Sequence, residues 1–162
     1  SQHGVHLSVV EGAEIANERQ KLVMFDKLTQ ALGGSVKGTR IAVWGLAFKA
    51  RTDDLRESPA LTLIAALLAA GATVVAHDPI AMTHAKAQLG DTVTFAASGY
   101  DALVGADALA VVTDWNEYRH PDFARMFATL SQPIIVDGRN LYNPEKMARL
   151  GFTYTSIGRP VA

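Results

Sequence analysis

The stretch RIAVWGLAFKARTDDLRESP, residues 40–59, carries the signals of a buried strand, a long loop and the start of a helix. Residues 41–45 form a short apolar run that is typical of a strand buried on both faces of a parallel sheet. A charged loop follows, roughly twice as long as the usual strand-to-helix connection of about 2 to 6 residues. Ser58 and Pro59 then start a helix, because the serine caps the first turn and the missing proline N–H costs nothing there.

The order of strand, loop and helix continues to the end of the chain. Predicted strands cover residues 41–45, 73–76, 93–95, 108–113, 134–137 and 153–157, and predicted helices cover residues 59–70, 82–89, 98–104, 123–130 and a last segment from 144. This alternation is typical of a parallel sheet with helices on its faces. The sequence therefore predicts an α/β fold with a Rossmann-like, doubly wound parallel sheet.

A long connecting helix is predicted before this sheet. Residues 9–32 contain no proline and end at two glycines. Apolar residues recur there at helical spacing, namely Leu22, Phe25, Leu28 and Leu32. Because residues 17–21 are too polar to be buried throughout, this helix lies across its own domain, links to a preceding domain, or pairs with its copy in a dimer. We assign residues 1–34 to a central linking and dimerisation helix with a truncated start, and residues 35–162 to the Rossmann-like domain.

Composition excludes several classes of protein. The 162 residues carry a formal net charge of −1, so no basic face for nucleic acid is expected. No segment approaches the roughly 18 unbroken apolar residues of a membrane span, and no secretory signal opens the sequence. The sequence contains no cysteine, which excludes a disulfide, a thiolate metal site and a cysteine nucleophile in these residues. We expect a cytoplasmic protein.

Four loops are candidates for a binding site, because ligands of open parallel sheets bind beyond the carboxyl ends of the strands. These are residues 45–57, 77–79, 113–115 and 137–140. The first lacks the G-x-G-x-x-G spacing of a dinucleotide site, since no glycine follows Gly45 until Gly71. A simple NAD-binding Rossmann domain is therefore not expected.

Cations replace the glycines in this predicted site. They are Lys49, Arg51 and Arg56 in the first loop and Arg139 after the fifth strand. Their convergence on the helix start at Ser58 would suit phosphate. Phe48 and Trp115 would add apolar surfaces, and Gly138 beside Arg139 would let the backbone approach a ligand.

Structural interpretations of the same residues stay open. Asp53 and Asp54 pair equally well with Arg51 and Arg56, which gives a salt-bridged surface loop. Phe48 and Trp115 also suit the core. His77 is expected only to end a strand. No metal site is predicted, because the histidines lack ligand spacing and nothing adds oxygen ligands to the two aspartates.

The segments GLAFKARTDDLRESP, AHDPIAM, TDWNEYRHPDF and VDGRNLYNP closely resemble the carboxy-terminal domain of the UDP-glucose/GDP-mannose dehydrogenases. The ANERQK segment resembles the long central helix of that family. The resemblance runs in register from about residue 10 to 159, and it favours the UDP-glucose branch over the GDP-mannose branch.

This resemblance implies a homodimeric enzyme of two Rossmann-like domains joined by the central helix. Such an enzyme oxidises UDP-glucose to UDP-glucuronate with two NAD, through a covalent thiohemiacetal. The resemblance places most of the NAD site in an amino-terminal domain, and the catalytic cysteine and lysine upstream of the helix. No catalytic residue is then expected in this chain.

Carried over by position, Phe48 and Lys49 match residues that contact the UDP-sugar, and Arg139 matches an arginine that contacts the UDP portion. Arg56 matches an arginine that reaches NAD from this domain. Two positions depart from the family pattern: Ala50 stands where proline is most frequent, and Arg51 where asparagine is common. Two alternatives remain open, a GDP-mannose 6-dehydrogenase domain and a stand-alone module that binds UDP-sugars without chemistry.

Overall fold

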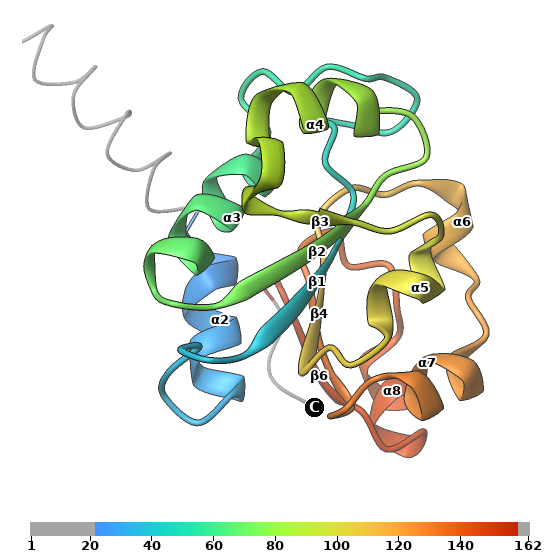
Figure 1. The fold of residues 1–162 in the computed structure, drawn as a ribbon. Coiled ribbons are helices and arrows are strands. Elements are labelled where there is room, and N and C mark those ends of the chain that lie inside the picture. Colours follow the sequence, from blue (N-terminus) through green and yellow to red (C-terminus); the bar gives the residue numbers. More distant parts are fainter. Residues whose placement is uncertain (1–21, 159–162) are drawn as a thin grey trace, which may run out of the picture.

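The computed structural model describes residues 22–158, which build one six-stranded parallel sheet (Figure 1). The strands are β1 (Arg40–Trp44), β2 (Thr73–His77), β3 (Thr94–Phe95), β4 (Ala108–Val111), β5 (Ile134–Asp137) and β6 (Thr153–Ser156). Their order in the sheet is β3-β2-β1-β4-β5-β6, and all neighbouring pairs are parallel. The strand order reverses between β1 and β4, where this type of sheet places its ligand.

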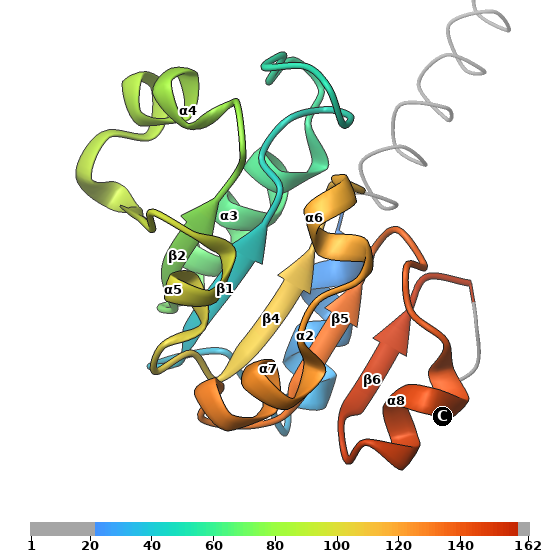
Figure 2. The same cartoon turned by 90° about the vertical axis from the view of Figure 1, so that its right-hand side faces the viewer.

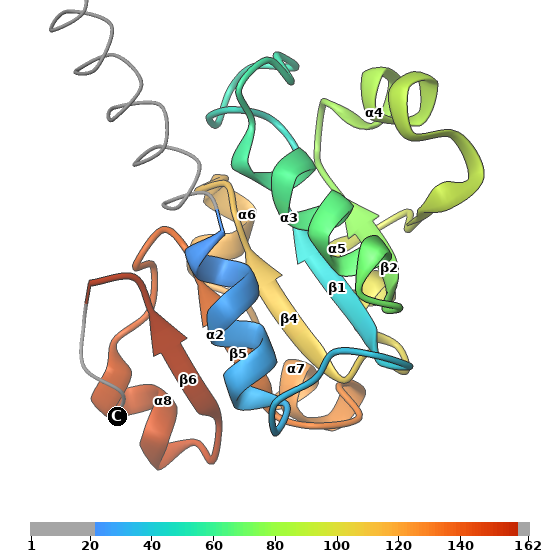
Figure 3. The ribbon, with the colours of Figure 1, turned by 90° about the vertical axis from the view of Figure 1, so that its left-hand side faces the viewer.

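Helices cover both faces of the sheet. They are α2 (Val23–Ala31), α3 (Pro59–Ala69), α4 (Met82–Leu89), α5 (Gly99–Leu103), α6 (Asn116–Arg119), α7 (Phe123–Thr129) and α8 (Pro144–Arg149), with a 3₁₀ turn, η1, at Gly90–Thr92. Figure 3 shows α2 and α3 side by side on one face, and Figure 2 shows α5, α6 and α7 on the other. Helix α8 packs along β6, and α4 lies beyond the carboxyl end of β2. The predicted doubly wound architecture is confirmed.

The core follows from the apolar runs of the strands. Every residue of β4 and β5 is buried, as are four of the five in β1 and in β2. Helix α3 contributes Leu63, Ile64 and Leu67, which are 1% exposed or less. Its start is as predicted: Ser58 Oγ accepts a hydrogen bond from the N–H of Ala60 and donates one to the carbonyl of Leu46.

The predicted strands and helices agree with the structure to within about two residues at most ends, the usual uncertainty of helix boundaries. Helix α6 and η1 were not predicted, because each is only one turn long. Of the long amino-terminal helix, the described part is α2, where Met24 and Leu28 are buried against the sheet. The remainder of that helix lies outside the described residues. The division at residue 34 stays a prediction. Within residues 22–158, no helix is long and apolar enough to span a bilayer.

Candidate functional site

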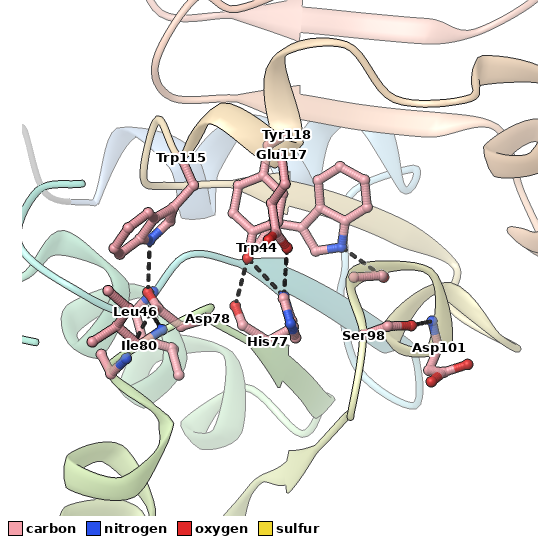
Figure 4. Close-up of polar contacts among 12 residues, drawn as sticks. Trp44, Leu46, His77, Asp78, Ile80, Ser98, Asp101, Trp115, Glu117 and Tyr118 are labelled. Carbon is pink, nitrogen blue, oxygen red and sulfur yellow. Dashed lines mark hydrogen bonds and ion pairs between the residues drawn. The ribbon is translucent and has the colours of Figure 1, made fainter. Parts of the chain in front are cut away.

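A buried carboxylate ties together three of the four predicted loops. Asp78, at the end of β2, is 2% exposed. Its Oδ2 accepts hydrogen bonds from the backbone N–H groups of Leu46 at 2.8 Å and Ala47 at 3.0 Å. Its Oδ1 accepts from those of Ile80 at 2.9 Å and Ala81 at 2.8 Å (Figure 4 draws the contacts to Leu46 and Ile80). The start of the 45–57 loop is therefore fixed by the loop after β2.

The loop after β4 joins the same assembly. The indole Nε1 of Trp115 donates to Asp78 Oδ2 at 3.1 Å, as Figure 4 shows, and Thr113 Oγ1 donates to the carbonyl of Ala47 at 2.8 Å. Gly45 makes this approach possible, because a Cβ built there would lie 2.4 Å from Thr113 Cβ. Trp115 is buried. Of the two interpretations of this residue, packing in the core is confirmed.

The position of Asp78 also bears on dinucleotide binding. A dinucleotide-binding Rossmann domain uses glycines in its first turn and an acidic residue beyond it to hydrogen bond the ribose. Here the acidic residue at the end of β2 has both oxygens occupied by protein N–H groups. The residues of this crevice therefore do not fit a dinucleotide in that manner.

The 45–57 loop is closed by the backbone hydrogen bond from the N–H of Phe48 to the carbonyl of Asp54, at 2.7 Å. Phe48 is 46% exposed and Lys49 is also exposed, so the predicted apolar and cationic side chains both face solvent. Arg51 and Glu57 have left-handed φ values of 66° and 57°. Side chains with a Cβ rarely take this conformation, and it concentrates at functional sites.

Arg56 is held by a neighbour in the same loop. Its Nε and Nη2 each donate to a different oxygen of Asp54 at 3.0 Å, while its side chain is 89% exposed. These hydrogen bonds from Arg56 lower the pKa of Asp54 to about 2 and raise that of Arg56. Asp53 pairs with His84 of α4 at 3.4 Å instead of with Arg51. The predicted salt-bridged loop is thus correct for Asp54, but the partner predicted for Asp53 is wrong.

An open groove of about 570 Å³ separates this loop from α4. Its lining residues are Thr52, Asp53, Asp54, Leu55, Arg56, His84 and Gln88. The guanidinium of Arg56 therefore stands beside a space large enough for part of a ligand. Among the described residues, no cluster of three or more histidine, aspartate or glutamate side chains has the arrangement of a metal site.

The fourth loop, after β5, is organised by Asp137. Its carboxylate accepts hydrogen bonds from the N–H groups of Arg139 and Leu141 and from the hydroxyl of Tyr154. The predicted role of Gly138, a close approach of the backbone to a ligand, stays a prediction. A Cβ there would lie 2.5 Å from the Met24 sulfur of α2, so close packing of this helix on the sheet explains the glycine.

The predicted convergence of cations at the start of α3 is only partly seen. Arg139 reaches Asp114 Oδ1 at 3.2 Å, while Arg56 is paired with Asp54. Arg139 and Arg56 thus pair with different carboxylates. What the two share is the carboxyl edge of the sheet, as the strand-end argument predicts.

A buried aromatic cluster packs beneath the carboxyl edge of the sheet. Tyr118 of α6 stacks on Trp44 with ring centroids 4.7 Å apart, and its hydroxyl lies 2.8 Å from His77 Nδ1 (Figure 4). His77 ends β2, as predicted. Burial lowers the pKa of His77 and raises that of Tyr118. Sequence reasoning placed Asp78 and Asp114 in the predicted loops without a role, and it missed Tyr118. Only the aspartates carried a signal, as polar residues just after a strand.

Comparisons with known proteins place this geometry in a family. The model of the UDP-glucose/GDP-mannose dehydrogenase family, UDP binding domain, matches residues 42–144. A UDP-glucose 6-dehydrogenase of Pseudomonas aeruginosa is 45% identical, with 99% of this chain and 37% of that protein covered. One of Rhizobium meliloti is 42% identical, with 98% and 36% covered.

Solved structures agree with this result. The structure of a UDP-glucose dehydrogenase from Pyrobaculum islandicum matches with a TM-score of 0.71 and 32% identity, covering 91% of this chain and 31% of that one. An NDP-N-acetyl-D-galactosaminuronic acid dehydrogenase from Methanosarcina mazei matches with a TM-score of 0.73 and 26% identity, covering 88% and 29%. The chain spans about a third of the length of these relatives. It belongs to the UDP-glucose/GDP-mannose dehydrogenase family, within which it corresponds to the UDP binding domain.

Proposed function

We propose that this chain binds the UDP portion of UDP-glucose within an NAD-dependent UDP-glucose 6-dehydrogenase, which oxidises UDP-glucose to UDP-glucuronate. The observation that carries the proposal is the 45–57 loop. Buried Asp78 fixes its start at the switch point of the sheet, and Phe48 and Lys49 project from it into solvent. Relatives named UDP-glucose 6-dehydrogenase support the choice of substrate.

Three side chains are assigned to the sugar nucleotide. Lys49 and Arg139 supply positive charge for the diphosphate, and charged hydrogen bonds of this kind contribute about 1.5 to 3 kcal/mol each when shielded from water. Phe48 offers an exposed ring against which a planar or apolar part of the ligand packs.

Arg56 is assigned to NAD. It borders the groove beside α4, and its contact with Asp54 is exposed, so exchanging that partner for a phosphate costs little. The crevice of this domain does not fit a dinucleotide in the Rossmann manner, which supports placing most of the NAD site outside this chain. The family resemblance places the catalytic residues there as well. The chain alone is therefore expected to produce no NADH from UDP-glucose.

The assembly proposed for the whole enzyme is a cytoplasmic homodimer, formed through the helix of residues 1–34, that supplies UDP-glucuronate for polysaccharide biosynthesis. An apolar groove of about 700 Å³ between α2 and α3 supports a packing partner there; its lining includes Phe25, Ala66 and Ala69. Light scattering tests the dimer, and a monomeric mass at high protein concentration would contradict it.

Calorimetric titration with UDP-glucose and GDP-mannose tests the binding function. We expect heat with UDP-glucose, weaker or no heat with GDP-mannose, and a loss of affinity of about tenfold or more in Lys49→Ala and in Arg139→Ala. Lys37→Ala is the matched control, because this exposed lysine precedes β1 at the opposite end of the sheet. A folded chain that binds neither ligand would overturn the proposal, and preference for GDP-mannose would reassign the base.

A further inference from the structure

The carboxylate of Asp114 lies between two guanidinium groups. Its Oδ1 accepts from Arg139 Nη2 at 3.2 Å, and its Oδ2 accepts from Arg119 Nη2 at 3.1 Å. All three side chains are partly exposed, Asp114 least, at 27%. We call these residues the Asp114 triad. It joins the loop after β5 to the loop after β4, which lies next to it in the sheet.

Asp114 sits on a rigid support. The residue before it, Thr113, is fully buried and bonded to the 45–57 loop. The residue after it, Trp115, is anchored to Asp78. Neither neighbour can move without breaking a buried hydrogen bond, so the carboxylate is held at a fixed place on the edge of the sheet.

The two arginines are also fixed at their backbones. Asp137 accepts the N–H of Arg139 at 2.8 Å. Arg119 follows Tyr118, which is 1% exposed and donates to the carbonyl of His77. Only the long side chains of the arginines are therefore left to be ordered, and Asp114 orders both.

The contact between Arg139 and Asp114 uses one nitrogen of the guanidinium. A guanidinium carries five N–H donors in a planar fork, so the remaining donors suit a phosphate oxygen pair. Asp114 thus orders the side chain of Arg139 and leaves its other N–H donors available for the ligand. A carboxylate beside a diphosphate site would by itself repel the ligand, and Arg119 offsets that charge.

We propose that Asp114 is a positioning residue for Arg139, and that Arg119 neutralises Asp114 so that the diphosphate of a nucleoside diphosphate is not repelled. This inference rests on the proposed function, because it concerns the same binding site. Neither residue contacts the ligand in this arrangement. Asp114 affects affinity through the position of Arg139, and Arg119 affects it by offsetting the negative charge of Asp114.

The test is a double-mutant cycle of Asp114 and Arg119 on the complete chain. Calorimetry measures the affinity of each variant for UDP. Arg119→Ala leaves the charge of Asp114 uncompensated, so we expect roughly fivefold weaker binding. In Asp114→Asn with Arg119→Ala that repulsion is gone, and affinity returns to within about twofold of Asp114→Asn alone. Arg119→Lys keeps the charge without the fork and should bind as tightly as wild type.

Urea unfolding of each variant separates this role from a structural one. Because the triad is partly exposed, the urea midpoint should hardly change. Arg149→Ala, an exposed arginine on α8, is the matched control for affinity.

Four results would count against the idea, and UDP binding by wild type separates the first three from the last. Suppose that wild type binds UDP. If Arg119→Ala then loses no affinity, or if Arg119→Ala and Arg119→Lys lose the same affinity, the inference is overturned and the proposed function stands. A loss in Arg119→Ala that Asp114→Asn does not reverse would do the same. Wild type without UDP binding would overturn both.

Discussion

Trp115 Nε1 donates a hydrogen bond to Oδ2 of Asp78, and this contact joins the loop after β4 to the loops after β1 and β2. The two residues are 37 positions apart in the chain and both are buried. A single carboxylate thereby sets the shape of most of the ligand-facing edge.

Asp78→Asn should destabilise the fold by about 3 kcal/mol, because an amide NH₂ would face N–H groups that now share a charged acceptor. Urea denaturation measures this loss. Asp122→Asn is the control: Asp122 caps α7 by accepting from the N–H of Arg125, and asparagine caps nearly as well. Equal losses in the two variants would contradict the organising role of Asp78.

Gly45→Ala should cost about 3 kcal/mol, because the new Cβ would meet the backbone and side chain of Thr113 and the residue has a φ of 97°. Gly38→Ala is a matched variant with a φ of 77° and nothing within 4 Å, so only about 1 kcal/mol of conformational strain is expected. Thermal or urea unfolding compares the two. If both lose the same amount, close approach to Thr113 is not what requires glycine at 45.

Arg51→Asn should stabilise the chain by about 0.5 kcal/mol or more. Arginine at 51 has a φ of 66°, and asparagine tolerates this left-handed conformation better than other side chains with a Cβ. Asparagine is also the residue that the family resemblance suggests for this position. Arg51→Val should destabilise, since a β-branched side chain is strained there. If the unfolding curves show that Arg51→Val is more stable than Arg51→Asn, the explanation is wrong.

The carboxyl group of Asp54 should titrate with a pKa of about 2 in wild type, and with one nearer 3.8 in Arg56→Ala. The side-chain hydrogen bonds from Arg56 are the largest cause of the lowering, and the charge of Lys49 contributes less. Lys49→Ala should therefore change the pKa only slightly. Carbon-detected NMR of the carboxyl group follows the titration. The stability from this pair is present above about pH 4 and is lost as the pH falls through the folded pKa near 2.

Lowering the pH should destabilise the fold through His77. Burial holds its pKa below the ordinary value of 6.5, so the unfolded chain binds more protons once the pH falls below that value. Stability is therefore complete above about 6.5, falls as the pH falls, and levels off below the folded pKa. Glu117, at 3.7 Å, works against this by favouring the charged imidazole.

Urea midpoints between pH 7 and pH 5 measure the effect. In His77→Asn, the urea midpoint should depend less on pH, because the contribution of His77 is lost. In Glu117→Gln, it should depend more steeply on pH, because the opposing charge is gone. A slope that does not change in His77→Asn would show that other groups cause it.

The architecture could be predicted from local patterns. Apolar runs of strand length, the Ser58 and Pro59 helix start and the glycine at 71 are each encoded within a few residues, and the structure confirms them. Helix α6 could not be predicted, because its one turn is held by tertiary contacts of Tyr118 with Trp44 and His77.

The candidate site also has features that could be predicted from the sequence and features that could not. The exposed loop carrying Phe48 and Lys49 could be located because it follows a strand, and strand ends share an edge. The contact of Arg56 with Asp54 was also predicted, because the two residues are close in sequence. The contact of Arg139 could not be, since it meets Asp114 25 positions away. The packing of Met24 against Gly138 could not be predicted either, because the helix that carries Met24 lies more than a hundred residues earlier in the chain.

Most of the secondary structure, the parallel sheet and the family could be read from the sequence, because periodicity, caps and motifs are local patterns that do not depend on distant neighbours. Tertiary structure alone decided which polar groups meet. Asp78 became the organiser of three loops, since a buried carboxylate must collect its donors from whichever segments the fold brings within hydrogen-bond distance. Asp114, which is only partly buried, became the partner of two arginines because the fold brings the loops after β4 and β5 side by side.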